Sequence, residues 1–212
     1  MIASAFRLAV LAVLLASPVL CSAQADAPIA KPDVKPGERW TYQRTDLLKN
    51  APDYVYELVV AYAKGDAILT VHKQHGKEKE ADATWTSEWN VVASAQGQVF
   101  KTDNPLLRFP LRPGASHSYV SEMVWPREGS WRVRWDMTTK VIGWEEVTVP
   151  AGKFRAMKVE SSGNFQRLDV RGAEGVARWI VWYVPEVKRW VKITYQGGVS
   201  RWGDELIEFK LQ

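Results

Sequence analysis

Strict alternation of apolar and polar side chains runs through most of this chain and constrains its fold more than any other feature. Residues 131–136 show it clearly, because Trp131, Val133 and Trp135 oppose two arginines and an aspartate. A period of two with aromatic and β-branched side chains is typical of β-strands, and helical periodicity is almost absent. We therefore predict an all-β protein.

The predicted strands follow one another closely. Their connectors are short and rich in Gly, Pro, Asp and Lys, and Gly143 inside one strand pattern suggests a bulge. A dozen strands with short links predict a curved, mainly antiparallel sheet forming a barrel or half-barrel, with a β-sandwich as the alternative. The longest apolar connector, 102–110, suits a flap across an open end. The strands are expected at 39–47, 54–62, 66–73, 84–91, 97–101, 117–125, 131–136, 138–149, 154–162, 176–184, 189–196 and 204–211.

The amino terminus predicts export. Residues 1–25 have the basic start, apolar run and small-residue ending of a signal peptide, with cleavage expected after Ala25. Lipid attachment at Cys21 is the competing interpretation, which the large Leu20 before it disfavours. Residues 26–36 read as a flexible tether and 37–212 as a single β domain, and we expect a periplasmic location.

Composition limits the function classes. The one Cys lies in the signal, so the mature chain is expected to have no disulfide or thiol chemistry. Its mild positive charge gives no support for nucleic acid binding, and no second apolar run suggests a transmembrane span after signal removal. The unusual number is 11 Trp, all of them after the signal.

Catalytic and metal signals are weak. His72 and His75 are three residues apart, and positions three apart on a strand face opposite ways, so these two could converge only if a turn intervened. Lysines flank them, and a solvated loop explains them better than a metal site. The sequence lacks a G-x-S-x-G elbow, and Glu145 and Glu146 are adjacent on a strand. We therefore expect no catalytic residues, metal or cofactor, and predict that the protein is not an enzyme.

Aromatic stripes are the strongest feature. Large rings on one face of a strand usually belong to a core. Residues 178–184, however, are apolar on both faces, so one face needs a cover, a ligand or a partner. The candidate ligand-binding residues are Trp85, Trp89, Trp131, Trp135, Trp179, Trp182 and Tyr183.

Two stretches, "EEVTVPAGKFRAMKVE" (145–160) and "WIVWYVPEVKRWVKITYQ" (179–196), followed by "DELIEFKLQ", carry a family pattern. They resemble an uncharacterised family of exported Gram-negative bacterial β-proteins with V-x-V-P-A-G-x-F and W-Y-x-P-E-V-x-R-x-V motifs. More loosely, the arrangement is similar to that of periplasmic lipoprotein carriers, which shield acyl chains in a half-barrel. This chain has no helical lid segment, so lipid carriage is an expectation from fold analogy.

Three functions follow from these observations. The first is a non-enzymatic envelope protein that binds an apolar or amphiphilic, lipid-like ligand in a Trp-lined concavity. The second is carbohydrate binding by exposed Trp rings. The third is a structural or assembly role with another envelope protein as partner, using strand edges and the doubly apolar strand.

Overall fold

The computed structural model describes residues 27–126 and 131–212, which form twelve strands and one short 3-10 helix. The signal-peptide and cleavage predictions lie outside the described residues. The elements are β1 (Arg39–Asp46), β2 (Ala51–Lys64), β3 (Ala67–Gln74), β4 (Ala81–Thr86), β5 (Val91–Ala93), β6 (Val99–Phe100), β7 (Ser116–Trp125), β8 (Trp131–Val149), β9 (Gly152–Arg167), β10 (Glu174–Val184), η1 (Pro185–Val187), β11 (Arg189–Gly197) and β12 (Ser200–Lys210).

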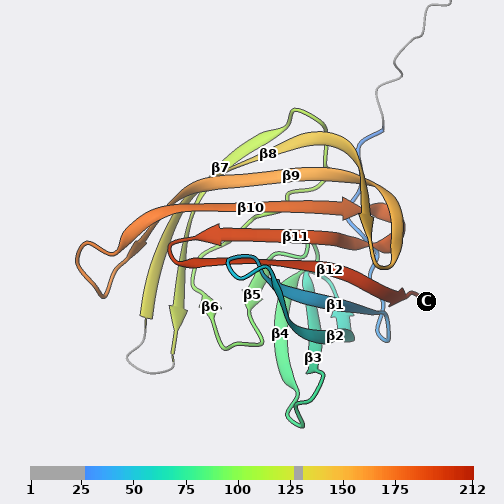
Figure 1. Ribbon diagram of the computed structural model, residues 1–212. Helices are drawn as coiled ribbons and strands as arrows, with labels where there is room; N and C mark the ends of the chain where they lie inside the picture. The colour runs from blue at the N-terminus through green and yellow to red at the C-terminus, as the bar shows by residue number, and fades with distance from the viewer. Residues whose placement is uncertain (1–26, 127–130) are drawn as a thin grey trace, which may run out of the picture.

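The strands close into a barrel (Figure 1). Each strand pairs antiparallel with its neighbour in sequence, and β1 pairs with both β2 and β12, which completes the ring. The prediction of an antiparallel barrel is thereby confirmed, and the sandwich alternative is not the fold. Closure is narrowest at β5 and β6, because β7 pairs with β6 through two residues only.

Strand positions agree well with the alternation, although several bounds differ and the predicted strand 84–91 is divided between β4 and β5. Residues 131–136 and 138–149 belong to one long strand, β8, whose register shifts between Val141 and Gly143. That shift confirms the bulge, and Gly143 has a φ of 145° that suits glycine. Trp89 was expected in a strand with Trp85 but follows β4 in a turn, with a φ of 63°.

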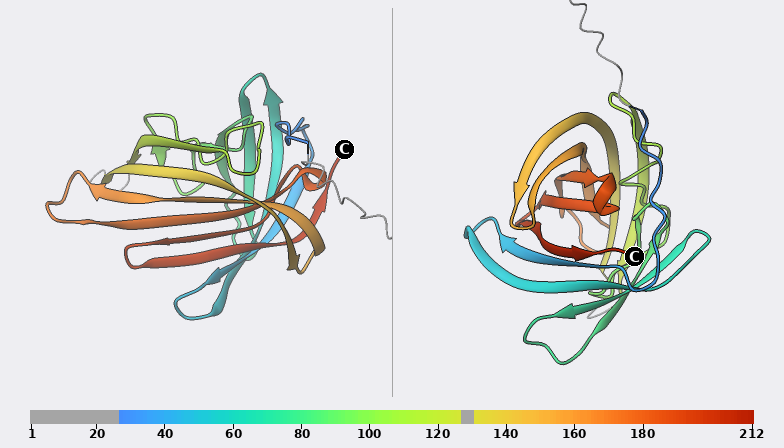
Figure 2. Two further views of the ribbon diagram at one scale, coloured as in Figure 1. Left: turned by 90° about the horizontal axis from the view of Figure 1, so that it is seen from above. Right: turned by 90° about the vertical axis from the view of Figure 1, so that its right-hand side faces the viewer.

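The barrel has two different ends, seen from three directions in Figures 1 and 2. At the end that we call the hairpin end, on the left in Figure 1, the turns 47–50, 168–173 and 198–199 connect strands. At the opposite end, here called the tether end, lie η1, the carboxyl terminus and the segment leading into β1.

The described part of the expected tether, 27–36, packs on the barrel. Ile29 exchanges backbone hydrogen bonds of 3.0 and 2.9 Å with Leu111 and is buried. The 102–110 connector also contributes to the interior, because Leu107 is fully buried and Asn90 bonds both its amide N and its carbonyl O. Both segments therefore close the tether end of the core.

Candidate functional site

Five partly buried aromatic side chains gather on the inner face near the hairpin end, and we call them the mouth cluster. Trp179 is its centre, with its ring centroid 4.4 Å from that of Tyr195 and 5.5 Å from that of Trp202. Trp135 contacts Tyr195 at 6.4 Å and Phe165 at 5.7 Å. The strands place these residues together because Trp179 pairs with Tyr195, Tyr195 with Trp202, and Trp135 with Phe165.

Small residues make room for these rings. A Cβ at Gly197 would overlap the Tyr195 hydroxyl, so a larger residue there would displace the ring. Burial raises the pKa of Tyr195 to about 12, so its hydroxyl is neutral at physiological pH. The mouth cluster therefore has no charged side chain of its own, and each of its five side chains keeps some exposure to solvent.

A polar layer lies next to the mouth cluster. The Arg44 guanidinium stands 3.7 Å from the Trp202 ring centroid and donates to Asp204, with Nη2 to Oδ2 at 2.7 Å. The Tyr56 hydroxyl donates to the same Oδ2 at 2.8 Å. His72 stacks on Tyr56 at 5.6 Å, and burial, followed by the charges of Arg189 and Arg44, lowers its pKa to about 3.

Beyond the polar layer, Arg189 is 1% exposed and surrounded by indole rings. Its guanidinium carbon lies 3.9 to 5.8 Å from four ring centroids, and burial lowers its pKa. Its Nε and Nη1 have no hydrogen-bond partner within the described residues. The rings of this arginine cage are Trp40, Trp85, Trp89 and Trp190.

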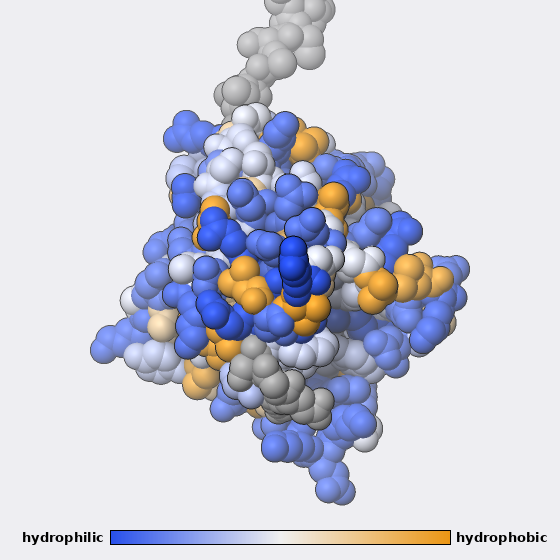
Figure 3. All heavy atoms as spheres, turned by 90° about the vertical axis from the view of Figure 1, so that its left-hand side faces the viewer, coloured by the Kyte–Doolittle hydropathy of each residue, from blue (hydrophilic) through white to orange (hydrophobic). Residues whose placement is uncertain are grey.

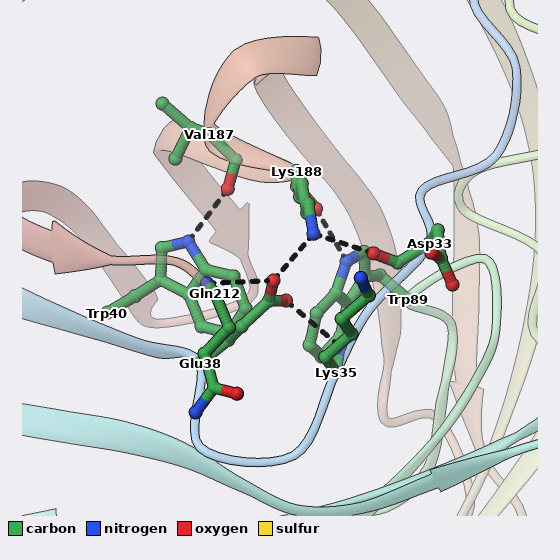
Figure 4. Close-up of polar contacts among 8 residues, drawn as sticks. All are labelled: Asp33, Lys35, Glu38, Trp40, Trp89, Val187, Lys188 and Gln212. Atoms are coloured by element: carbon green, nitrogen blue, oxygen red, sulfur yellow. Dashed lines mark hydrogen bonds and ion pairs between the residues drawn. The ribbon is translucent and has the colours of Figure 1, made fainter.

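The arginine cage is tied to the tether end by a lock of hydrogen bonds (Figure 4). Glu38 is fully buried and accepts from Lys188 Nζ at 2.5 Å, while the same Nζ donates to the Asp33 carbonyl at 2.7 Å. Trp40 Nε1 donates to the Val187 carbonyl at 2.9 Å, and Trp89 Nε1 donates to that of Lys188 at 2.8 Å. These contacts hold the tether, the η1 turn and the cage together.

A pocket of about 440 Å³ lies outside this lock, between the tether and the β10–η1 turn. Residues 27–33 form one wall, and Trp144, Tyr183, Pro185 and Lys188 form the other. Its lining is mostly apolar. It is separate from the mouth cluster, since it lies at the opposite end of the barrel.

The structure distributes the seven predicted site residues over several places. Trp135 and Trp179 join the mouth cluster, whereas Trp85 and Trp89 belong to the arginine cage. Tyr183 is buried against Phe109 at 5.2 Å and borders the tether pocket. The remaining two, Trp131 and Trp182, lie apart from both clusters.

Trp182 resolves the question of the doubly apolar strand. It faces away from the lumen, beside two lysines whose Nζ atoms lie 5.6 Å from its ring, and its Nε1 donates to Glu145 at 3.1 Å. Lys158 and Lys192 are its strand neighbours, so their aliphatic stems cover the ring. Trp131 stands at the hairpin end, 44% exposed, against Trp125.

Several interior residues were not predicted. Phe165 and Trp202 lie just outside the predicted strands 154–162 and 204–211. Tyr195 lies inside a predicted strand, on the same face as Val191 and Ile193, but it was not chosen as a site residue. Arg44 and Arg189 gave no sequence signal, because a charged residue in an alternating strand is normally placed outside.

The two histidines have different environments. His72 is a partly buried side chain between Tyr56 and Trp85, so the solvated-loop interpretation is wrong for it, whereas His75 is an exposed turn residue. Residues 27–126 and 131–212 contain no group of three or more His, Cys, Asp or Glu side chains placed to hold a metal ion. No helix within these ranges is long and apolar enough to cross a membrane.

Two solved structures share the fold, and a third is less similar. A candidate lipoprotein from Parabacteroides distasonis matches with a TM-score of 0.57 at 14% identity, over 87% of this chain and 100% of the other. A candidate exported protein with a YmcC-like fold from Bacteroides fragilis matches at 0.55 and 13%, with the same coverage. The hypothetical lipoprotein YmcC of Escherichia coli gives 0.47 and 8% over 82% and 85%.

No family model and no curated protein matches the sequence. This chain is an antiparallel β-barrel, and it shares that fold with the first two structures. At 13–14% identity the likeness concerns the fold alone.

Proposed function

We propose that this protein is a non-enzymatic, exported envelope protein that binds an apolar or amphiphilic, lipid-like ligand at the mouth cluster. The observation that carries the proposal is the partial exposure of five contacting rings on the inner face of the barrel. A packed core would bury such rings completely, as it does Trp40 and Tyr42. Covering them with a ligand removes apolar surface from water, at roughly 25 cal/mol per Å².

Two further points support the proposal. The signal-like amino terminus agrees with the names of the two structural neighbours, one called exported and the other a lipoprotein, so we propose a periplasmic location. The five rings of the mouth cluster are neutral, and the nearby Arg44 is already paired with Asp204, which favours an acyl chain or another apolar group over an ion. The rest of the ligand would then lie toward the solvent.

Carbohydrate binding is less well supported. Stacking on sugar faces needs exposed indole rings, and in the described part of the chain Trp131 is the one exposed Trp, at 44%. The row of exposed rings that this hypothesis requires is therefore not found among the described residues.

The test uses brominated fatty acids, which quench Trp fluorescence on contact. We expect saturable quenching in the mature protein and its loss, by at least tenfold in affinity, in Trp179→Ala. Trp182→Phe is the matched control, because that ring lies on the outer face, and it should bind normally. Unchanged affinity in Trp179→Ala combined with loss in Trp144→Ala would move the site to the tether pocket, and absence of quenching in the wild type would refute the proposal.

A further inference from the structure

The hairpin end carries exposed aliphatic side chains on separate turns (Figure 3). Val199, at the tip of the β11–β12 turn, is 95% exposed, and Leu48, in the β1–β2 turn, is 65% exposed. Leu168 and Val170 are exposed in the β9–β10 turn. These four residues, which we call the rim, come from three separate hairpins whose tips lie at the same end of the barrel (Figure 1).

The charges around the rim balance. Asp46 pairs with Lys49 at 3.3 Å, and Asp169 accepts from Arg167 Nε at 2.9 Å. Segments 46–53, 167–174 and 197–201 together contain four basic and four acidic residues, so these hairpins have no net charge. A partner attracted by charge alone would have little to recognise here.

The shape of the rim suits insertion into a lipid bilayer better than docking to a protein. Each tip is a convex turn with one or two aliphatic side chains among polar ones, and a protein partner would need a matched pocket for each. A bilayer accepts such tips without preformed pockets. Trp131, 4.3 Å from the Arg167 guanidinium, adds the pairing of indole and arginine that favours the headgroup region.

We infer that the rim docks the barrel onto the surface of a phospholipid bilayer by inserting its aliphatic tips, with the mouth cluster facing the lipid. The barrel itself stays outside the membrane. Its role in ligand uptake rests on the proposed function, because a mouth held at the bilayer would take an amphiphile directly from it. The docking itself does not depend on a ligand being bound.

The test is co-sedimentation of the mature, ligand-free protein with phosphatidylcholine vesicles at 0.1 M and 0.5 M NaCl. We expect binding at both salt concentrations and a loss of at least about tenfold in partitioning for Leu48→Asp/Val199→Asp, since each inserted aliphatic side chain contributes on the order of tenfold. Ile142→Asp is the matched control, because Ile142 is 51% exposed on β8, outside the hairpin turns, and it should bind like the wild type.

Four outcomes would overturn the inference. They are absence of vesicle binding by the wild type, wild-type binding by the double variant, binding restricted to phosphatidylglycerol vesicles and abolished by 0.5 M NaCl, and a wild-type dimer in sedimentation velocity that the double variant disperses. The last would assign the rim to contact between two copies. Because no fatty acid is present, these results are independent of the fluorescence test, and the thermal midpoint of the double variant confirms that it folds.

Discussion

The Tyr56 hydroxyl donates a 2.8 Å hydrogen bond to Asp204, a carboxylate that is only 2% exposed and also pairs with Arg44. Asp204→Asn would leave Arg44 without its counter-charge in the barrel interior, and we expect it to lower the free energy of unfolding by about 3 to 5 kcal/mol. Tyr56→Phe removes one hydrogen bond and should cost about 1.5 to 3 kcal/mol. Urea unfolding measures both, and equal losses would show that Asp204 is not the centre of the network.

The His72 environment makes stability depend on pH. Its pKa is lowered from 6.5 to about 3 in the folded protein, so between these values the unfolded chain binds more protons. The His72 contribution is therefore complete above about pH 6.5 and is lost progressively as pH falls toward 3. As the pH is lowered from 7 to 4.5, the free energy of unfolding should decrease more steeply in the wild type than in His72→Gln.

His75→Gln is the control for this measurement, because His75 is exposed in a turn and should leave the pH slope unchanged. A slope that is the same in wild type and His72→Gln would mean that carboxylates alone produce the acid sensitivity.

The lock at the tether end predicts a difference between two lysines. Lys188→Met leaves the fully buried Glu38 without its cation and should cost about 3 kcal/mol. It should also speed hydrogen exchange in residues 27–36, since Lys188 holds the Asp33 carbonyl. Lys192→Met removes the partly exposed pair with Glu205 and should cost less than about 1 kcal/mol. Unchanged exchange in 27–36 would contradict the lock.

Gly163 on β9 lies where the backbone of β8 leaves no room for a side chain. A Cβ there would overlap the backbone carbonyl oxygen of Asp136, which no side-chain movement relieves. We expect Gly163→Ala to lose about 3 kcal/mol or more in thermal or urea unfolding. In Gly76→Ala the new Cβ meets open space, and the only cost comes from the positive φ of 77°. We therefore expect a loss of about 1 kcal/mol in the free energy of unfolding. A loss in Gly163→Ala no larger than in Gly76→Ala would contradict this reading.

Alternation predicted the strands well because it depends on one local rule, that neighbouring side chains face opposite ways. It did not decide which face of residues 179–184 is inside, since both are apolar. Closure of the barrel decides which face is inside. Trp179 packs against Tyr195 in the interior, and Trp182 faces outward between two lysines.

The interior of the barrel was harder to predict than its wall. Arg189 follows a turn and looks like a surface residue, yet the αL conformation of Lys188 directs the chain so that four indole rings surround it. Trp89 leaves the strand pattern because Thr86 Oγ1 accepts from the Asn90 amide and builds a turn. Such contacts join segments up to about a hundred residues apart, as Trp89 to Lys188 does, and no local pattern records them.

The carboxyl terminus lies against the start of the barrel, where the Gln212 amide approaches Glu38 at 3.5 Å and its side chain fills the space beside Gly37. The first and last residues of the domain thus lie close together at the tether end, so a short linker could join them. A circular permutant, joined by a short linker from 212 to 37 and opened at 198–199, would keep the same strand order. Its new ends would emerge beside Val199, where a label or surface anchor would sit at the hairpin end.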